Sequence, residues 1–238
     1  RFVDGIVVRD IDIASTMSIS VRRTMSESLI KNLVALHRVD IDEVGLGDLA
    51  KRTGYIERQV KRWIGQWENS RTRELPIVDA VASALLDRMP EPNPTTIAHG
   101  DYRLSNCMMS SQGLVTAVLD WELCTLGEPM ADLGGLLGYW HDPQETDPAG
   151  DAESTGLTGF LTQDEMASLY AEAMGVDMGS ISYYRAFAQW RLACIAEGVY
   201  ARYLGGQQGA QDEEIDLERM KDSVTERAER AAQLLDMD

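Results

Sequence analysis

The sequence predicts an α+β fold that is mainly helical and carries one small β-hairpin. Apolar residues recur at helical spacing in several long segments, for example from Ser18 to Val39. The segment from Cys107 to Leu119 instead combines short apolar and β-branched runs with a turn at Ser110-Ser111-Gln112-Gly113, which is typical of a hairpin. Helices therefore form the body of the predicted fold, and the hairpin is the exception within it.

The remaining elements follow from the same periodicities. The first twelve residues are predicted to be extended, because a turn at Asp4-Gly5 precedes a β-branched run. Thr162, followed three residues later by Glu165, has the spacing of a helix capping box. Exposed loops are expected over His141–Thr158 and at the break Gly205–Gly209. Helices are predicted over Ser18–Val39, Tyr55–Glu68 and Ile77–Arg88, from near Met130, and from Thr162 to the end apart from that break.

Composition and charge exclude several classes of protein. The 238 residues carry a net charge of −17, which argues against nucleic acid as a partner because phosphate backbones attract basic surfaces. No apolar run is long enough to cross a membrane, so we expect no membrane partner. The three cysteines are scattered without metal-ligand spacing, which is typical of reduced thiols in a cytoplasmic protein. Much of the acidic charge is expected to be solvated surface.

One stretch carries the chemistry. His99-Gly100-Asp101-Tyr102-Arg103-Leu104-Ser105-Asn106 has the pattern H-x-D-x-x-x-x-N, and Asp120-Trp121-Glu122 follows the predicted hairpin. Because a hairpin returns the chain beside its start, Asp120 is expected to lie near Asp101 and Asn106. Carboxylate and amide oxygens are the hard ligands that Mg²⁺ prefers, with phosphates and water completing its coordination. The pattern therefore indicates a metal-assisted catalytic loop of the kind used in phosphoryl transfer.

Each residue of the pattern has an expected role. We expect Asp101 to orient or accept the proton of a substrate hydroxyl, and Asn106 and Asp120 to bind magnesium and through it the nucleotide phosphates. Arg103 is expected to stabilise the charge that develops on the transferred phosphoryl group. Glu122 is either a further metal ligand or a residue that orients the ligands.

Two residues are expected to support the loop without reacting. His99 is predicted to hydrogen-bond within it, and Asp132, in Ala131-Asp132-Leu133-Gly134, to be a buried group that holds it in place. The competing interpretation is a buried polar turn in which His99, Asp101 and Asn106 only satisfy backbone groups.

These motifs resemble a known superfamily. His99–Asn106, Asp120-Trp121-Glu122 and Gly127–Leu133 are similar to the aminoglycoside phosphotransferase and choline kinase superfamily. Within it, the chain most resembles the kinase-like domains related to those fused to acyl-CoA dehydrogenases, on softer similarity at Val3-Asp4-Gly5 and from Tyr183 to Gly205.

The resemblance implies a protein-kinase-like fold, an ATP- and Mg²⁺-dependent kinase, and a small-molecule hydroxyl as acceptor. Members of the superfamily begin with a β-rich lobe of about a hundred residues that holds ATP through a glycine-rich loop and a lysine. We therefore expect residues 1–12 to be the remnant of the hinge to that lobe, and residues 13–238 to be the helical C-terminal lobe. The chain alone is expected to be inactive. A second copy of the chain is a candidate partner, because the surface that packs against the N-terminal lobe is expected to be apolar and would be exposed without it.

The acceptor and the activity both have alternatives. An acidic cleft would suit an aminoglycoside, whereas the branch resemblance implies hydroxyacyl compounds, including CoA thioesters. The alternative to a kinase is a non-catalytic kinase-like binding module, or a metal-dependent hydrolase in which Asp101 and Asp120 act on water. Release of ADP that depends on an acceptor would distinguish the kinase from both.

Overall fold

The computed structural model describes residues 3–143, 154–206 and 216–237. The chain divides into two compact units, which are described separately. The first consists of Arg1–Thr53 and Pro92–Ile181, and the second of Gly54–Glu91 and Ser182–Asp238. The catalytic-loop motif lies in the first unit.

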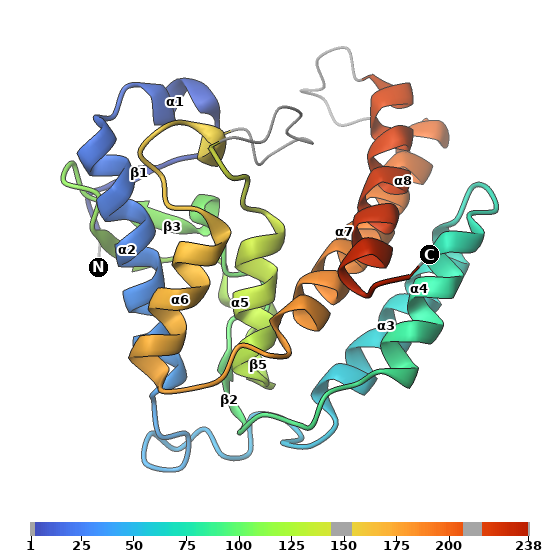
Figure 1. Cartoon of the computed structure of the whole chain (residues 1–238), viewed down its shortest axis with the longest axis horizontal. Helices are drawn as coiled ribbons and strands as arrows, with labels where there is room; N and C mark the ends of the chain where they lie inside the picture. Colours follow the sequence, from blue (N-terminus) through green and yellow to red (C-terminus); the bar gives the residue numbers. More distant parts are fainter. Residues whose placement is uncertain (1–2, 144–153, 207–215, 238) are drawn as a thin grey trace. The chain divides into compact units, whose positions relative to one another are not determined.

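Four helices form the body of the first unit: α1 (Ile11–Ser15), α2 (Ile19–His37), α5 (Pro129–Gly138) and α6 (Gln163–Met174). Ser18 caps α2 by accepting a hydrogen bond from the Val21 amide. The predicted capping box of α6 is confirmed, because Thr162 and Glu165 bond to each other's backbone amides. Helices α2 and α6 pack along each other, and Figure 1 shows α5 beside them.

Two small sheets complete the first unit. In one, β3 (Cys107–Met109) lies between β1 (Ile6–Val7) and β4 (Val115–Val118), and both pairings are antiparallel. The predicted hairpin is thus confirmed as β3 and β4, and Cys107 pairs with Val118. In the other sheet, β2 (Thr96–Ala98) pairs antiparallel with β5 (Thr125–Gly127), so that Ala98 lies opposite Thr125.

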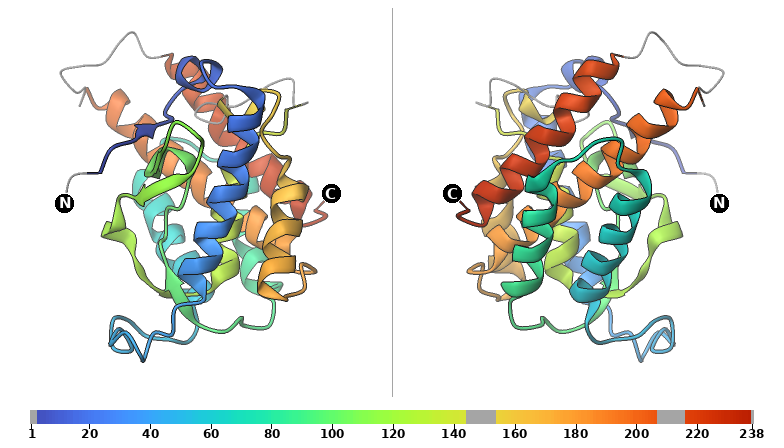
Figure 2. Two further views of the ribbon diagram at one scale, coloured as in Figure 1. Left: turned by 90° about the vertical axis from the view of Figure 1, so that its left-hand side faces the viewer. Right: turned by 90° about the vertical axis from the view of Figure 1, so that its right-hand side faces the viewer.

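Among its described residues, the second unit consists of helices and the loops between them, with no strand. Its helices are α3 (Tyr55–Ser70), α4 (Pro76–Asp87), α7 (Ile181–Leu204) and α8 (Leu217–Leu234). Two buried aromatic side chains of α7 join it to α4, since Tyr183 donates to the Leu85 carbonyl and Trp190 to the Val78 carbonyl. The right-hand view of Figure 2 shows these helices by their colours, blue-green for α3 and α4 and orange to red for α7 and α8.

A buried ion pair fixes one connection of the second unit. Glu197, on α7, is fully buried and accepts hydrogen bonds from the Thr72 amide, the Thr72 hydroxyl and the Arg73 guanidinium. Arg73 also donates to the Lys221 carbonyl of α8. The loop between α3 and α4 is therefore bound to both C-terminal helices.

The elements agree with the predicted mainly helical α+β fold, with three corrections. The helix predicted from Thr162 to the break at Gly205 is interrupted, because α6 ends at Met174 with Gly175 in a left-handed conformation, and α7 begins only at Ile181. The extended segment predicted to reach Asp12 ends earlier, because Asp10 caps α1 by accepting from the Ile13 amide. The β2–β5 ladder was not predicted. The loop predicted at His141–Thr158 lies largely outside the described residues, as does most of Gly205–Gly209, although α7 does end at Leu204.

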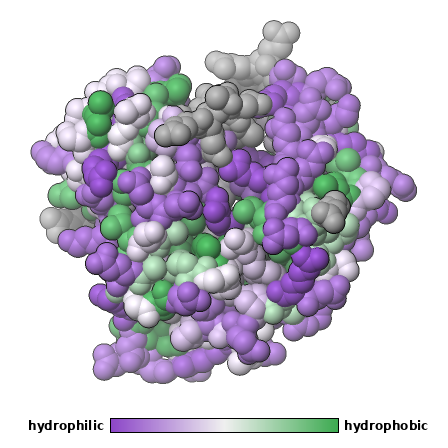
Figure 3. Space-filling model, viewed as in Figure 1, coloured by the Kyte–Doolittle hydropathy of each residue, from purple (hydrophilic) through white to green (hydrophobic). Residues whose placement is uncertain are grey.

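The surface of the protein is largely hydrophilic. Hydrophilic residues cover most of the face shown in Figure 3, as expected for a net charge of −17. Among the described residues, none of the helices has both the length and the apolar content needed to cross a bilayer.

Candidate active site

The catalytic-loop motif leaves the second sheet at the end of β2 and enters the first sheet at β3. Between them, a single 3₁₀ turn spans Leu104–Asn106. Gly100 has a φ of +84°, and a Cβ atom there would lie 2.8 Å from the Leu123 carbonyl oxygen. Only glycine meets both conditions, so the loop approaches the Trp121–Leu123 turn as closely as backbone allows.

Three predicted site residues are in direct contact. The Asn106 side-chain nitrogen donates to the Asp101 backbone oxygen at 2.8 Å and to the Asp101 carboxylate at 2.9 Å. The Arg103 guanidinium lies 3.4 Å from the same carboxylate oxygen. An amide and a guanidinium thus converge on one carboxylate, which holds Asp101 in a single orientation.

Arg103 is held from its other side by an aromatic ring. The centre of its guanidinium lies 4.8 Å from the centroid of the Tyr139 ring, at the end of α5. Its side chain is 26% exposed and that of Asp101 is 16% exposed, so both groups are accessible to a ligand from one side.

Asp120 is placed by the residue before it. Leu119 donates its amide to the Asn106 carbonyl at 2.8 Å and accepts a hydrogen bond from the His99 ring, also at 2.8 Å. Asp120 itself is exposed and has φ 63° and ψ 58°, a left-handed conformation that is uncommon outside glycine. Glu122 is exposed in the adjacent 3₁₀ turn, Trp121–Leu123. The structure thus brings the backbone of Leu119, the residue before Asp120, to Asn106. Among the described contacts, none joins the carboxylate of Asp120 or Glu122 to Asp101.

Asp132 holds the first turn of the loop. From the first turn of α5 its buried carboxylate accepts hydrogen bonds from the His99 amide at 2.6 Å and from the Gly100 amide at 2.8 Å. Its Oδ2 atom also lies 3.4 Å from Nε2 of His37, the last residue of α2. A charged acceptor that satisfies two backbone donors fixes the position of the loop relative to α5.

The contact continues from His37 to α6. Nδ1 of His37 lies 2.7 Å from the Tyr170 hydroxyl, which is also buried. Burial, with the Asp132 carboxylate nearby, raises the pKa of Tyr170, so its hydroxyl remains protonated. Because the Asp132 carboxylate can only accept, Nε2 of His37 is the nitrogen that donates to it. Sequence analysis assigned no such link, because the three residues lie on separate helices.

His99 is fully buried and uses both ring nitrogens within the loop. Nε2 bonds to the Leu119 carbonyl, so that Nδ1 accepts from the Asp101 amide at 3.3 Å. The ring also lies 4.8 Å, centroid to centroid, from Trp121. His99 therefore joins the two halves of the motif, before and after the hairpin.

The donor set around Asn106 suits a hard cation. Since the side-chain nitrogen of Asn106 is directed at Asp101, the amide oxygen of Asn106 remains as an acceptor. The exposed carboxylate of Asp120 belongs to the residue after Leu119, whose amide is hydrogen-bonded to the Asn106 carbonyl. Within the described ranges, no group of three or more His, Cys, Asp or Glu side chains is placed to hold a metal ion. A metal here would therefore take few protein ligands and draw the others from phosphates and water, as Mg²⁺ commonly does.

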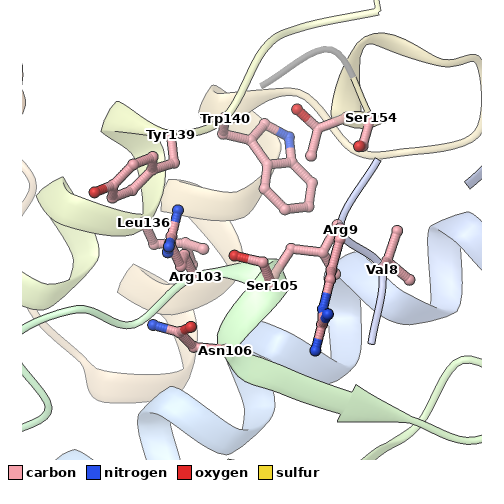
Figure 4. Close-up of a pocket in the computed structure, with 11 residues that line it drawn as sticks. Val8, Arg9, Arg103, Ser105, Asn106, Leu136, Tyr139, Trp140 and Ser154 are labelled. Atoms are coloured by element: carbon pink, nitrogen blue, oxygen red, sulfur yellow. The ribbon is translucent and has the colours of Figure 1, made fainter. Parts of the chain in front are cut away.

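A pocket of about 370 Å³ opens beside the loop (Figure 4). One part of its wall is apolar, and the other carries two arginines and several hydroxyl groups. It is lined by Val8, Arg9, Arg103, Leu104, Ser105, Asn106, Leu136, Tyr139, Trp140, Ser154 and Thr155. Sequence analysis identified only Arg103 and Asn106 among these; Arg9 belongs to no motif, and its place shortly after Val3-Asp4-Gly5 was the only signal.

Comparison with known proteins identifies the family. The profile of the phosphotransferase enzyme family matches residues 1–167. The chain belongs to this family. Rat acyl-CoA dehydrogenase family member 11 is 33% identical to the chain over 216 residues, which are 88% of this chain and 28% of the rat protein. The chain thus spans little more than a quarter of the length of such curated relatives.

Solved structures of phosphotransferases share the fold. A Ralstonia eutropha protein with a provisional assignment as an aminoglycoside phosphotransferase has a TM-score of 0.83 and 31% identity, over 99% of this chain and 71% of that one. The ADP-bound aminoglycoside phosphotransferase APH(2'')-Ib has a TM-score of 0.52 and 13% identity, over 98% of this chain and 71% of that one, which shows the fold alone. The predicted protein-kinase-like fold and the inferred superfamily are both confirmed.

Proposed function

We propose that the chain transfers the γ-phosphoryl group of ATP to a hydroxyl group of a small molecule, with Mg²⁺ as the cofactor. The observation that carries the proposal is the Asp101–Asn106–Arg103 contact at the edge of a ligand-sized pocket. Pockets of about 300–1,000 Å³ are typical of small-molecule sites, and this one falls within that range.

Asp101 is the proposed proton acceptor. Its carboxylate receives the proton of the acceptor hydroxyl as the oxygen forms a bond to the γ-phosphorus and the bond to the bridging oxygen of ATP breaks. The products are ADP and a phosphate monoester. The contacts from Asn106 and Arg103 both reach the Oδ2 atom of Asp101 and keep the carboxylate in place.

Asn106 and Asp120 are the proposed magnesium ligands, through the amide oxygen of the first and the carboxylate of the second. When bound, the ion would offset the negative charge of the nucleotide phosphates. Glu122 is proposed to orient this pair, since it is exposed two residues after Asp120. Arg103 supplies a fixed positive charge at the other side of Asp101 and stabilises the transferred phosphoryl group.

His99 and Asp132 are proposed as positioning residues. Asp132 fixes the amides of His99 and Gly100, and the His99 ring joins Asp101 to Leu119. The distance between the proton acceptor and the magnesium ligands therefore depends on both.

The comparisons support a nucleotide substrate but not a particular acceptor. A phosphotransferase with the same fold is known in an ADP-bound form, which supports the use of an adenine nucleotide here. The rat relative is named for a dehydrogenase reaction, but only 28% of its length corresponds to this chain. We also propose the division expected from the sequence. Residues 13–238 are the helical catalytic lobe, and residues 1–12 belong to the hinge that joins it to the ATP-binding lobe.

The test measures ADP formation by the complete gene product that contains this chain. With magnesium-ATP and a panel of hydroxylated small molecules, ADP release should depend on an acceptor. Asp101→Asn, which keeps the shape of the side chain, should reduce it about 100-fold or more, whereas Asp48→Asn, at an exposed loop carboxylate, should not. Phosphate release without an acceptor would indicate a hydrolase, and nucleotide binding without turnover a binding module.

A further inference from the structure

The α5 helix contacts the catalytic loop at two points that lie two helical turns apart. Asp132, in the first turn of α5, accepts hydrogen bonds from the His99 and Gly100 amides. Tyr139, which caps the C-terminal end of the helix, lies under the guanidinium of Arg103. Positions seven residues apart share a face of a helix and are separated by about 10.5 Å along its axis. One helix therefore determines where both the start of the loop and Arg103 lie.

The backbone that carries the Tyr139 ring is fixed on both sides. It remains helical, with φ −91° and ψ −4°, and its amide donates to the Gly135 and Leu136 carbonyls. The next residue, Trp140, is buried and donates its indole nitrogen to the Leu161 carbonyl. The aromatic ring is thus presented to the loop from a well-defined position.

The ion pair between Arg103 and Asp101 does not by itself fix the guanidinium. Nε of Arg103 lies 3.4 Å from Oδ2 of Asp101, whereas a charge-assisted hydrogen bond is usually about 2.7–2.9 Å long. The same oxygen accepts a shorter hydrogen bond, of 2.9 Å, from Asn106. The Tyr139 ring centroid lies 4.8 Å from the centre of the guanidinium, within the distance of about 6 Å over which an aromatic face attracts a cation. The ring therefore supplies a second contact that determines the position of the cation.

The two contacts of Arg103 respond differently when a phosphoryl group arrives. The ion pair is directional, and the oxygens of a phosphoryl group compete with Asp101 for the same guanidinium. A cation–π contact depends mainly on the distance to the ring, so the guanidinium can shift along the ring face and keep most of this attraction. In Figure 4, Arg103 lies between Tyr139 and Asn106 at the edge of the pocket. Tyr139 can thus retain Arg103 there while the partner of Arg103 changes.

We propose that Tyr139 is a positioning residue that acts on phosphoryl transfer through Arg103. Its ring keeps the guanidinium beside the transferred phosphoryl group, so that the Asp101 carboxylate is released to receive the hydroxyl proton. The aromatic face is the required feature, and the hydroxyl group of Tyr139 is not. The inference rests on the proposed kinase function, and it adds a residue that lies outside the sequence motifs.

The first test compares side chains with and without a ring at position 139 in the complete gene product. Tyr139→Leu should reduce kcat for acceptor-dependent ADP release about tenfold, with KM for ATP and for the acceptor changed less than about threefold. Tyr139→Met, a second variant without a ring, should behave in the same way. Tyr139→Phe, which keeps the ring, should retain kcat within about twofold.

Tyr200→Leu is the matched control for this comparison. It removes the ring that lies 5.4 Å from the Arg73 guanidinium in the second unit, and it should leave kcat unchanged. Two results would overturn the inference. If Tyr139→Leu raises KM and leaves kcat unchanged, the ring only forms a wall of the pocket. If Tyr139→Phe loses as much activity as Tyr139→Leu, the hydroxyl group is the functional part.

A double-mutant cycle shows whether the effect of Tyr139 passes through Arg103. In an Arg103→Met background, Tyr139→Leu should reduce kcat by less than about twofold, because the ring then has no cation to position. A further loss of about tenfold in that background would mean that Tyr139 supports the pocket independently of Arg103. The inference would then be wrong.

A measurement without turnover separates this inference from the proposed kinase function. Phenylglyoxal modifies accessible arginines, and peptide mass spectrometry distinguishes Arg103 from the others. The rate of modification of Arg103 in the folded protein should rise about threefold or more in Tyr139→Leu, but not in Tyr139→Phe. Equal rates in all three proteins would show that the ring does not hold Arg103.

The two proposals fail in different ways. Phosphoryl transfer by the parent protein with no change of kcat in Tyr139→Leu would retain the kinase and overturn the role of Tyr139. If no acceptor supports ADP release, while modification of Arg103 still depends on the ring, the kinase is overturned and Tyr139 is retained only as the residue that holds Arg103.

Discussion

The side-chain nitrogen of Asn106 donates to both the backbone oxygen and the carboxylate of Asp101, at 2.8 and 2.9 Å. The two residues are five positions apart and are joined by the 3₁₀ turn that ends at Asn106. This double contact fixes which end of the Asn106 amide is nitrogen, and so directs its oxygen away from Asp101. Asp101, the proposed proton acceptor, and Asn106, the proposed metal ligand, are thus oriented by one another.

Asn106→Asp should abolish this arrangement while changing the side chain by only one group. It replaces a donor with an acceptor beside the Asp101 carboxylate, and the two negative charges should separate. We expect the turnover number to fall about 100-fold or more, measured as acceptor-dependent ADP release. Asn32→Asp on α2, where the amide donates to the Ser28 carbonyl, is the matched control and should keep its activity. Full activity of Asn106→Asp would remove Asn106 from the site.

Asp120→Gly separates the backbone strain at this position from the function of the carboxylate. Glycine adopts a φ of 63° without cost, so the free energy of unfolding should change by no more than about 1 kcal/mol. Turnover should nevertheless fall more than tenfold, about 1.4 kcal/mol of barrier, because a proposed magnesium ligand is lost. Asp236→Gly, at the other left-handed non-glycine residue described, should leave turnover unchanged. Turnover of Asp120→Gly within tenfold of the parent would exclude the ligand role.

Arg73→Met should destabilise the second unit strongly. The substitution leaves Glu197 fully buried without its guanidinium partner and also removes the bond to the Lys221 carbonyl. We expect a loss of about 3 kcal/mol or more in the free energy of unfolding, measured by urea denaturation. The control is Arg23→Met, which breaks an exposed ion pair with Glu27 on α2 and should cost less than about 1 kcal/mol. If both variants lost a similar amount of unfolding free energy, the buried Arg73–Glu197 pair would contribute no more to stability than an exposed ion pair, which would contradict this prediction.

The three thiols should react at very different rates. Burial raises the pKa of Cys107 and of Cys194 to about 12, and it raises the pKa of the half-buried Cys124 as well. A raised pKa lowers the thiolate fraction, to roughly one in ten thousand at about pH 8 for the first two. Mass spectrometry after iodoacetamide treatment of the folded protein should show Cys124 alkylated first, and the other two only after denaturation. Equal labelling of Cys107 and Cys124 would show that the hairpin opens readily.

Local signals in the sequence accounted for most of the fold. The α2 helix and the capping box at Thr162 depend on residues a few positions apart, and the β3–β4 hairpin closes through a short turn, so each could be predicted. The β2–β5 ladder could not, because two strands of three residues carry no periodicity and pair only once the tertiary structure has formed.

The same distinction between local and long-range contacts applies to the candidate site. Asp101, Arg103 and Asn106 form part of a motif, and their mutual contact follows from the turn between them. Arg9 and the His37–Tyr170 contact have no sequence signature, because each depends on helices or loops brought together from distant parts of the chain. The net charge of −17 was attributed mainly to solvated surface, and it gives no indication of the two arginines, Arg9 and Arg103, among the described residues that line the pocket.

The pairing of Ala98 with Thr125 means that the whole segment from His99 to Cys124 is a single excursion, closed at its base by the β2–β5 ladder. Asp101, Asn106, Asp120 and Glu122 all lie on it. Closing such a loop costs chain entropy once, and that cost is met when the ladder forms. Opening the ladder would therefore release all four side chains together, while the hydrogen bonds within α2 and α6 persist. In hydrogen exchange, the amides of the excursion should then open as one cooperative unit and not residue by residue.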